Sequence, residues 1–254
     1  MLSRIFWKSQ SKITGAAKIN TLTILAVILL AGSFALSAVL TKLAAKLALK
    51  TGLLAKPAAD RYHQSVVPLG GGIAIFATIA LIILTAIAVV KFLIEPGYLN
   101  WLGESVIIHT QGFLDKIAHL MIVLLCIFTL FTLGLIDDKK HLGPYLKLAV
   151  QFAVALTAAF FADIRVELFI QNRIVTSLLS AFWIVLIINV FNFLDNMDGA
   201  SAGIAAIASL ILLTAAAQSG QVFIGAMAVI FIGTLLGFLV FNFPPAKIFA
   251  GDAG

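Results

Sequence analysis

The sequence predicts an all-α fold, a polytopic membrane helical bundle with about seven transmembrane helices. Hydrophobic residues make up 62% of the 254 positions and charged residues only 11%, whereas about a quarter of the residues in a soluble domain are charged. In addition, apolar stretches recur at the length that crosses a bilayer as a helix, which is about 20 residues. Lipid is therefore the solvent for most of this chain.

The expected spans follow one another with short connections. They lie at about 22–41, 70–94, 117–136, 148–163, 174–192, 203–217 and 222–242. The first span follows a basic segment, but it is long and has no small-residue cleavage site, which indicates a retained helix and not a signal peptide. Because no internal repeat or long linker divides the chain, we expect one membrane-embedded domain over residues 1–254.

Alternating spans would place the connecting segments on two membrane faces. Face A receives residues 42–69, 137–147, 193–202 and 243–254, and face B receives 95–116, 164–173 and 218–221. Apart from the basic N-terminal tail, which falls on face B, nine Lys and Arg residues lie on face A and four on face B. Because cytoplasmic loops are enriched in Lys and Arg, we expect face A to be the cytoplasmic face of the cell membrane. The net charge of +6 is scattered between spans, so we expect membrane lipid or phosphate as the partner and no nucleic acid.

Two adjacent carboxylates, Asp137 and Asp138, end the third span. The helix macrodipole disfavours negative charge at a helix C-terminus, so a positive group should compensate them. Lys139 and Lys140 would suffice if the four residues were only a cap at the lipid–water boundary.

The residues that follow favour a site over a simple cap. Pro144 suits the first turn of a new helix, and Lys147 and Gln151, four residues apart, share one face of that helix. We therefore expect an amine and an amide to face the two carboxylates.

Asn and Asp residues are concentrated where the fifth span ends, in NVFNFLDNMDGASAG. They are Asn189, Asn192, Asp195, Asn196 and Asp198. A continuous helix, with about 100° per residue, would scatter them around its circumference, but Gly199 permits a bend that turns the last carboxylate back toward the others. Hydrogen bonds between helices account for one or two Asn residues, and the remaining polar groups indicate a functional site.

Two further polar clusters fall on face A. The string FNFPPAKIFAGDAG contains Lys247 and Asp252, although Gly-Asp-Ala-Gly alone is usually only a turn. In KPAADRYHQSVVPLGGG, Arg61 and His63 precede a glycine run whose free backbone N–H groups could bind an anion. A lone His is more often structural, so this cluster is secondary.

Carboxylate and Asn oxygens together suit Mg²⁺, or alternatively Mn²⁺, and such cations commonly serve phosphate chemistry. Lys147 and Arg61 would then contact phosphate oxygens. The residues predict a metal-dependent enzyme that acts on phosphorylated substrates, one of them a lipid, at face A. A secondary transporter is the main alternative, and it would place the acids at the bilayer midplane. A CDP-alcohol phosphotransferase is disfavoured, because Ala202-Gly203 stands where that class needs Ala-Arg.

At these four clusters the sequence resembles the polyprenyl-phosphate N-acetylhexosamine-1-phosphate transferases of glycosyltransferase family 4. This superfamily includes the undecaprenyl-phosphate GlcNAc-1-phosphate transferases and the phospho-MurNAc-pentapeptide translocases. The resemblance extends in order from about residue 53 to the end. It implies a Mg²⁺-dependent transfer of an N-acetylhexosamine 1-phosphate from a UDP-sugar to a polyprenyl phosphate such as undecaprenyl phosphate. The products would be UMP and a polyprenyl diphosphate-linked sugar for cell-envelope polysaccharides, such as those of the cell wall or lipopolysaccharide.

The resemblance also implies roles for individual residues. Asn192 and Asp252 would bind the metal with the diphosphate, and Asp137, Asp138 and Lys147 would position the lipid phosphate and its charge. The substrate-binding residues it implies are Asn189, Asp195, Asp198, Gln151, Arg61 and His63. Residues 61–72 resemble the branch that uses UDP-GlcNAc more than the branch with a peptide-bearing substrate.

The chain departs from the family pattern in three places. Ala55 stands where Asp is frequent and Ala200 where Leu is usual, and both changes are mild. The family normally continues through further spans and a cytosolic loop with His and Arg, so we expect the C-terminal part of the family domain to be missing. An inactive fragment of the family therefore remains an alternative, and a homodimer is an assembly that the sequence leaves open.

Overall fold

A computed structural model of the protein describes residues 2–55, 67–167 and 169–254, with side chains from residue 21 onward. The expected substrate-binding residues Arg61 and His63 lie outside these described residues. In the described part, seven helices are long and apolar enough to cross a membrane. The prediction of an all-α polytopic membrane fold is confirmed.

The elements follow in a simple order. The helices are α1 (Leu2–Thr51), α2 (Gly71–Val89), α3 (Glu104–Ile107), α4 (Thr110–Lys140), α5 (Pro144–Phe161), α6 (Arg173–Leu194), α7 (Ala200–Gln218) and α8 (Val222–Asn242). A π-helical turn η1 (Val90–Ile94) and a 3-10 turn η2 (Asn100–Leu102) connect α2 to α3. Two short strands, β1 (Leu54–Ala55) and β2 (Val67–Pro68), pair antiparallel.

Two spans are longer than the sequence predicts. The first covers Thr21–Thr51 and the third Glu104–Lys140, where the apolar pattern predicts 22–41 and 117–136. Hydropathy detects only the most apolar part of a span, so the last turns of α1, and the short helix α3 with the first turns of α4, escape it. The fourth span, Pro144–Phe161, is about 27 Å long, close to the thickness of a hydrocarbon core.

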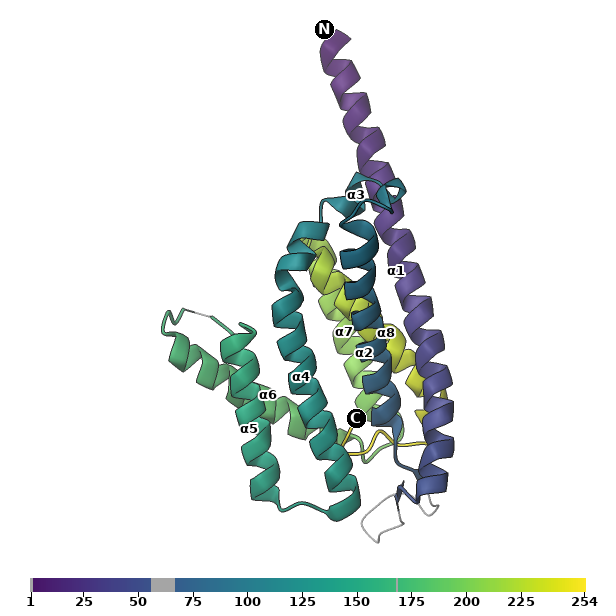
Figure 1. Ribbon diagram of the computed structural model, residues 1–254, viewed down its shortest axis with the longest axis vertical. Helices are drawn as coiled ribbons and strands as arrows, with labels where there is room; N and C mark the ends of the chain where they lie inside the picture. The colour runs from purple at the N-terminus through teal and green to yellow at the C-terminus, as the bar shows by residue number, and fades with distance from the viewer. Residues whose placement is uncertain (1, 56–66, 168) are drawn as a thin grey trace.

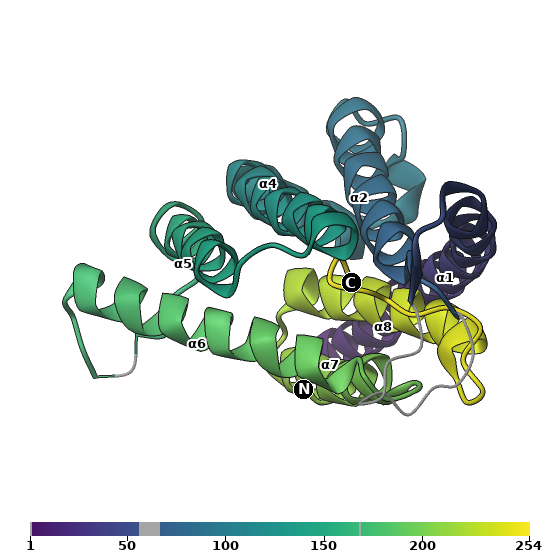
Figure 2. The same ribbon diagram turned by 90° about the horizontal axis from the view of Figure 1, so that it is seen from below.

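Helix α8 occupies the centre of the bundle. It packs against α1, α2 and α7, while α4 lies beside α2, and α5 and α6 form a hairpin on one side (Figures 1 and 2). Half of the α8 span is buried, more than in any other span of the described residues.

Small residues allow α1 and α8 to approach closely. A side chain at Gly233 or Gly237 would overlap the α1 backbone or Ser33, and the Ser37 hydroxyl donates to the Thr234 carbonyl at 2.6 Å. Small residues commonly serve this purpose where membrane helices meet, because lipid offers no hydrophobic drive for association.

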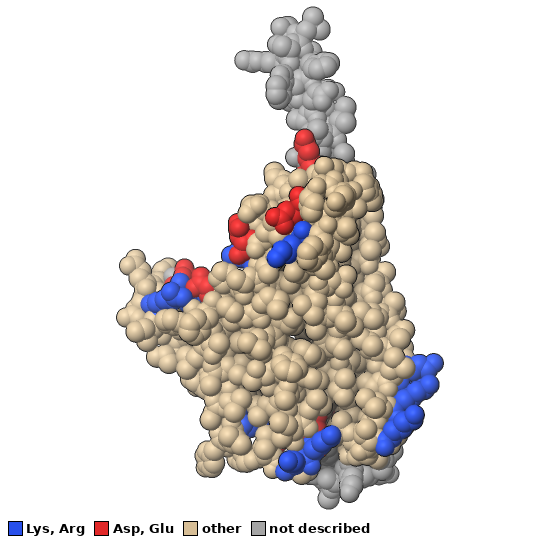
Figure 3. All heavy atoms as spheres, viewed as in Figure 1, with Lys and Arg blue, Asp and Glu red and all other residues tan. Residues whose placement is uncertain are grey.

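The polar clusters gather at one end of the bundle. The C-terminal ends of α4, α6 and α8 and the N-terminal ends of α2, α5 and α7 meet at the lower end of Figure 1. Charged side chains lie toward the two ends, and an almost uncharged band separates them (Figure 3). The expected alternation of the spans therefore holds, and face A is this lower end.

Residues 246–254, here called the C-terminal segment, fold back under the bundle and contact the start of α2. Phe249 N–H donates to Pro68 O at 3.0 Å, and Gly71 and Gly72 donate to Phe249 O and Ala250 O, each at 2.9 Å. The glycine run was predicted to offer free N–H groups to an anion. That prediction is wrong, because the C-terminal segment accepts these hydrogen bonds.

Candidate active site

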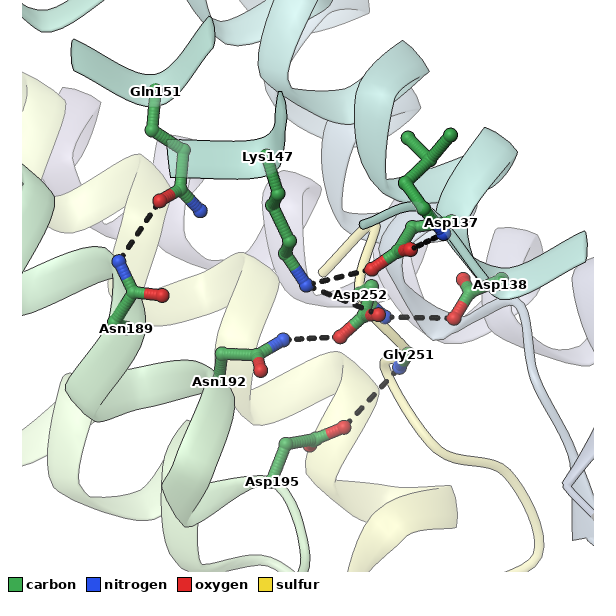
Figure 4. Close-up of polar contacts among 10 residues, drawn as sticks. Asp137, Asp138, Lys147, Gln151, Asn189, Asn192, Asp195, Gly251 and Asp252 are labelled. Atoms are coloured by element: carbon green, nitrogen blue, oxygen red, sulfur yellow. Dashed lines mark hydrogen bonds and ion pairs between the residues drawn. The ribbon is translucent and has the colours of Figure 1, made fainter. Parts of the chain in front are cut away.

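The Lys147 ammonium lies between two carboxylates from different parts of the chain (Figure 4). Its Nζ atom is 2.8 Å from Asp137 Oδ2 and 3.2 Å from Asp252 Oδ2. The side chains of Lys147, Asp137 and Asp252 are 17%, 9% and 29% exposed. The three groups are thus withdrawn from bulk water, but Asp252 remains accessible to a ligand.

Helix ends bring these groups together. Asp137 lies in the last turn of α4, and its Oδ1 atom accepts the Leu142 N–H at 2.6 Å, which fixes the connection to α5. Pro144 opens α5 as predicted, so Lys147 faces back toward Asp137 from the first turn. Lys147, and not the exposed pair Lys139 and Lys140, compensates Asp137.

Asp252 is held on several sides. Its Oδ1 atom accepts a hydrogen bond from the Asn192 side-chain amide, and its backbone N–H donates to Asp138 Oδ1 at 3.0 Å. The neighbouring Gly251 N–H donates to Asp195 Oδ2 at 3.2 Å. Asp138 and Asp195 therefore contact the backbone of the C-terminal segment, whereas Asn192 and Lys147 contact the Asp252 carboxylate itself.

Two glycines make room for the C-terminal segment. A Cβ atom at Gly134 on α4 would overlap the Asp252 carbonyl, and one at Gly72 on α2 would overlap Ala253. The backbone around Asp252 thus passes between α2 and α4 at a distance that no larger residue permits.

The α6–α7 connection has the predicted bend. Helix α6 ends at Leu194, Gly199 adopts φ 68°, and α7 begins at Ala200. This turn brings Asp198 to the C-terminal segment, where its Oδ2 atom accepts the Ala246 N–H at 2.9 Å.

Gln151 and Asn189 form a separate pair deeper in the bundle. Asn189 Nδ2 donates to Gln151 Oε1 at 2.9 Å and to Val185 O at 2.8 Å. Gln151 is 3% exposed. The sequence predicts that its amide faces the carboxylates, but the structure pairs it with Asn189 beside them (Figure 4).

The oxygen donors fit a hard divalent cation that is shared with a ligand. Asp252 and Asn192 lie side by side, and carboxylate and amide oxygens are the ligands that Mg²⁺ prefers. Asp138 Oδ2 is buried with no hydrogen-bond partner, so a further acceptor lies near them. Among the described residues, no group of three or more His, Cys, Asp or Glu side chains would hold a metal alone. Phosphate and water oxygens would have to complete the coordination, as they commonly do for Mg²⁺.

The charge balance of the site points the same way. The Lys147 ammonium contacts the carboxylates of Asp137 and Asp252, and a third carboxylate, that of Asp138, accepts the Asp252 backbone N–H. Carboxylates gathered at the end of α4 are also opposed by its macrodipole. The arrangement can therefore receive a cation and, through that cation and Lys147, a phosphorylated ligand.

The sequence prediction missed the residues that build the support of the site. Asn242 and Gly134 touch or hold the C-terminal segment but carry no charge. The only signal in the sequence is an Asn at the end of an apolar span and a glycine within a helix.

Comparison with known proteins identifies the family. The model for "Glycosyl transferase family 4" matches residues 120–254, the part that contains Asp137, Asp138, Lys147, Asn192, Asp195 and Asp252. The chain belongs to glycosyl transferase family 4. A relative from Geobacillus kaustophilus, named phospho-N-acetylmuramoyl-pentapeptide-transferase, is 32% identical over 238 residues, which are 90% of this chain and 70% of the relative.

Two further relatives carry related names. A Bacillus subtilis protein named probable undecaprenyl-phosphate N-acetylglucosaminyl 1-phosphate transferase is 29% identical over 223 residues, covering 85% of this chain and 55% of the relative. An Anoxybacillus flavithermus phospho-N-acetylmuramoyl-pentapeptide-transferase is 33% identical over 180 residues, or 64% and 54% of the two chains. The chain thus spans about half the length of these two relatives.

Proposed function

We propose that the protein transfers an N-acetylhexosamine 1-phosphate from a UDP-sugar to a polyprenyl phosphate. The products are a polyprenyl diphosphate-linked sugar and UMP. One observation carries the proposal: the Lys147 ammonium lies between Asp137 and Asp252, next to Asn192, at the membrane-boundary end of a family 4 bundle. The names of the relatives supply the reaction class. One is named an undecaprenyl-phosphate N-acetylglucosaminyl 1-phosphate transferase and the other a phospho-N-acetylmuramoyl-pentapeptide-transferase.

The chemistry needs a site that tolerates two phosphorylated reactants. An oxygen of the lipid phosphate forms a bond to the phosphorus that bears the sugar, the bond from that phosphorus to the UMP oxygen breaks, and UMP leaves with the electron pair. A lipid phosphate is largely ionised at neutral pH, so no strong base is required. The main obstacle is repulsion between the anions, and fixed positive charge lowers it.

The roles that we propose for Lys147, Asp137, Asp138, Asp252 and Asn192 follow from their contacts, whereas the role of the remaining residues follows from the family resemblance. The Lys147 ammonium neutralises charge where the lipid phosphate meets the diphosphate, and Asp137 orients Lys147. Asp138 holds the backbone of Asp252 and so acts on position. Asp252 and Asn192 would hold Mg²⁺ or Mn²⁺, which when bound would screen the diphosphate charge. Asn189, Gln151, Asp195 and Asp198 are assigned to the wall of the nucleotide-sugar pocket.

We place face A in the cytoplasm, where nucleotide sugars are available. The described lysines Lys42, Lys46, Lys50, Lys139 and Lys140 lie on this face, and cytoplasmic boundaries are enriched in Lys and Arg. A secondary transporter is less well supported, because the carboxylates lie at helix ends and not at the midplane.

The test is a transfer assay on the purified membrane protein. The protein is incubated with undecaprenyl phosphate, Mg²⁺ and radiolabelled UDP-GlcNAc, UDP-GalNAc or UDP-MurNAc-pentapeptide, and label is followed into organic solvent. The proposal predicts transfer that EDTA abolishes, and the sugar that is transferred identifies the branch. A fusion protein in which this chain replaces the matched 55% of the Bacillus subtilis relative is assayed in parallel. Failure of both proteins with every sugar overturns the proposal.

A further inference from the structure

Asn242 is a buried amide that joins two parts of the site. It ends α8 and is 2% exposed. Its Oδ1 atom accepts the Gly199 N–H at 3.1 Å, and its Nδ2 atom donates to Ile248 O at 2.9 Å. A single side chain thereby connects the α6–α7 turn to the C-terminal segment.

Gly199 and Ile248, the two residues that Asn242 bridges, both lie near the part of the chain that positions Asp252. Gly199 follows Asp198, which accepts the Ala246 N–H, and Ile248 lies four residues before Asp252. Ile248 is fully buried, so water does not replace the Asn242 amide as the partner of its carbonyl. The link therefore acts on the backbone that leads to the Asp252 carboxylate.

The link also selects one register of the C-terminal segment. A shift by one residue would remove Ile248 O from the Asn242 amide and leave buried polar groups without partners, which is costly. The same shift would also move Asp252 by about one residue length, roughly 3.3 Å, out of the turn that the Gly254 N–H closes with Gly251 O. Asp252 would then no longer point toward Asn192 and Lys147.

We propose that Asn242 is a positioning residue: by bridging Gly199 N–H and Ile248 O, it fixes the register of the C-terminal segment and so places the Asp252 carboxylate beside Lys147 and Asn192. The effect on placement stands on the contacts alone. Only its consequence for sugar-phosphate transfer rests on the proposed function.

Two substitutions separate the two hydrogen bonds. Asn242→Asp has nearly the same shape, keeps an acceptor for Gly199 N–H and loses the donor to Ile248 O. Asn242→Ala loses both. Asn196→Ala is the matched control, because Asn196 is exposed and its side-chain amide donates to Phe193 O within its own turn.

Amide hydrogen exchange, followed by mass spectrometry with residue-level fragmentation, measures the placement directly. In Asn242→Asp we expect the amides of residues 246–252 to exchange about ten- to a hundredfold faster, as expected for loss of one buried hydrogen bond, while Gly199 stays protected. In Asn242→Ala both regions should exchange faster, and Asn196→Ala should change neither. Unchanged exchange of residues 246–252 in both Asn242 variants overturns the inference, as does a uniform increase across all spans.

Steady-state transfer adds a second readout. If the proposed reaction occurs, both Asn242 variants should lower kcat about tenfold or more, because displacement of a reacting group by about 1 Å has effects of this size, while the KM for the UDP-sugar changes little. A fall confined to KM contradicts a positioning role. If neither the unsubstituted protein nor the fusion protein transfers sugar phosphate but the exchange pattern appears, the proposed function fails and the inference about placement is retained.

Discussion

Replacement of Gly134 by Ala tests whether close contact with α4 places Asp252. Ala is the better helix former by about 1 kcal/mol, so the helix alone favours this substitution. However, the added methyl carbon would overlap the carbonyl oxygen of Asp252. Ordinary van der Waals contact between such atoms requires about 3.5 Å, so the C-terminal segment must move by on the order of 1 Å.

The expected cost follows from this overlap. Insertion of a methyl group into a packed contact destabilises the folded protein by about 1–3 kcal/mol. Most of this range is larger than the gain of about 1 kcal/mol from helix propensity. A displacement of about 1 Å also moves the Asp252 carboxylate relative to Asn192 and Lys147, and we expect transfer to fall about 100-fold.

Gly112→Ala is the matched control in the same helix, because nothing lies within 4 Å of a Cβ atom at that position. Thermal unfolding in detergent and sugar-phosphate transfer are measured for both variants. Gly112→Ala should keep its activity and unfold at the same or a higher temperature. Equal activity and stability of the two variants would refute the packing of the C-terminal segment against α4.

Three further predictions concern charge, buried hydrogen bonds and pH. Lys147→Met should lower the transfer rate about 100-fold or more, because it removes a group that stabilises developing charge. Lys139 is exposed, so Lys139→Met should keep the transfer rate within about twofold of that of the unsubstituted protein. Similar losses for both variants would contradict the assigned role of Lys147. Asn189→Leu should lower the free energy of unfolding by about 1–3 kcal/mol, because it leaves the buried Gln151 amide without this partner. The double variant with Gln151→Leu should recover most of that loss. Denaturant unfolding measures both variants, and a further loss in the double variant would contradict the pairing. Outside the spans, the Arg165 side chain donates a hydrogen bond to Asp163 and lowers the pKa of that carboxyl. The pair therefore stabilises the fold at pH values above the ordinary pKa of Asp. This stabilisation is lost as the pH falls through the lowered pKa. Asp163→Asn, which tolerates the φ of 57° at this position, should therefore show a small loss in unfolding temperature at neutral pH that disappears in acid, and a loss that grows in acid would reverse the sign.

The sequence was sufficient to predict the membrane bundle and much of the polar end. Apolar stretches identified the seven spans of the described residues, because bilayer thickness imposes a minimum apolar length on every helix that crosses it. Pro144 predicted the start of α5 and Gly199 the bend before α7, since both residues restrict or permit backbone angles locally.

The remaining features depend on contacts between distant segments. The pairing of Gln151 with Asn189 and the use of the glycine run to bind the C-terminal segment arise from packing that no local pattern reports. The roles of Asn242 and Gly134 could not be predicted for the same reason. An uncharged Asn and a helical Gly show no function in the sequence until the fold places residues 246–252 against them.

The most direct test of the proposed reaction follows both parts of the transferred group. UDP-GlcNAc labelled with ³²P on the sugar-bearing phosphate and with ³H on the sugar is incubated with the protein and undecaprenyl phosphate, alongside Asp252→Asn. The account predicts that both labels enter the lipid in the ratio of the donor, that unlabelled UMP is released, and that Asp252→Asn loses both labels together. Entry of ³H into the lipid without ³²P contradicts the proposed reaction. Failure of both labels to enter with every UDP-sugar tested, for the fusion protein as well as for the unsubstituted protein, contradicts it too.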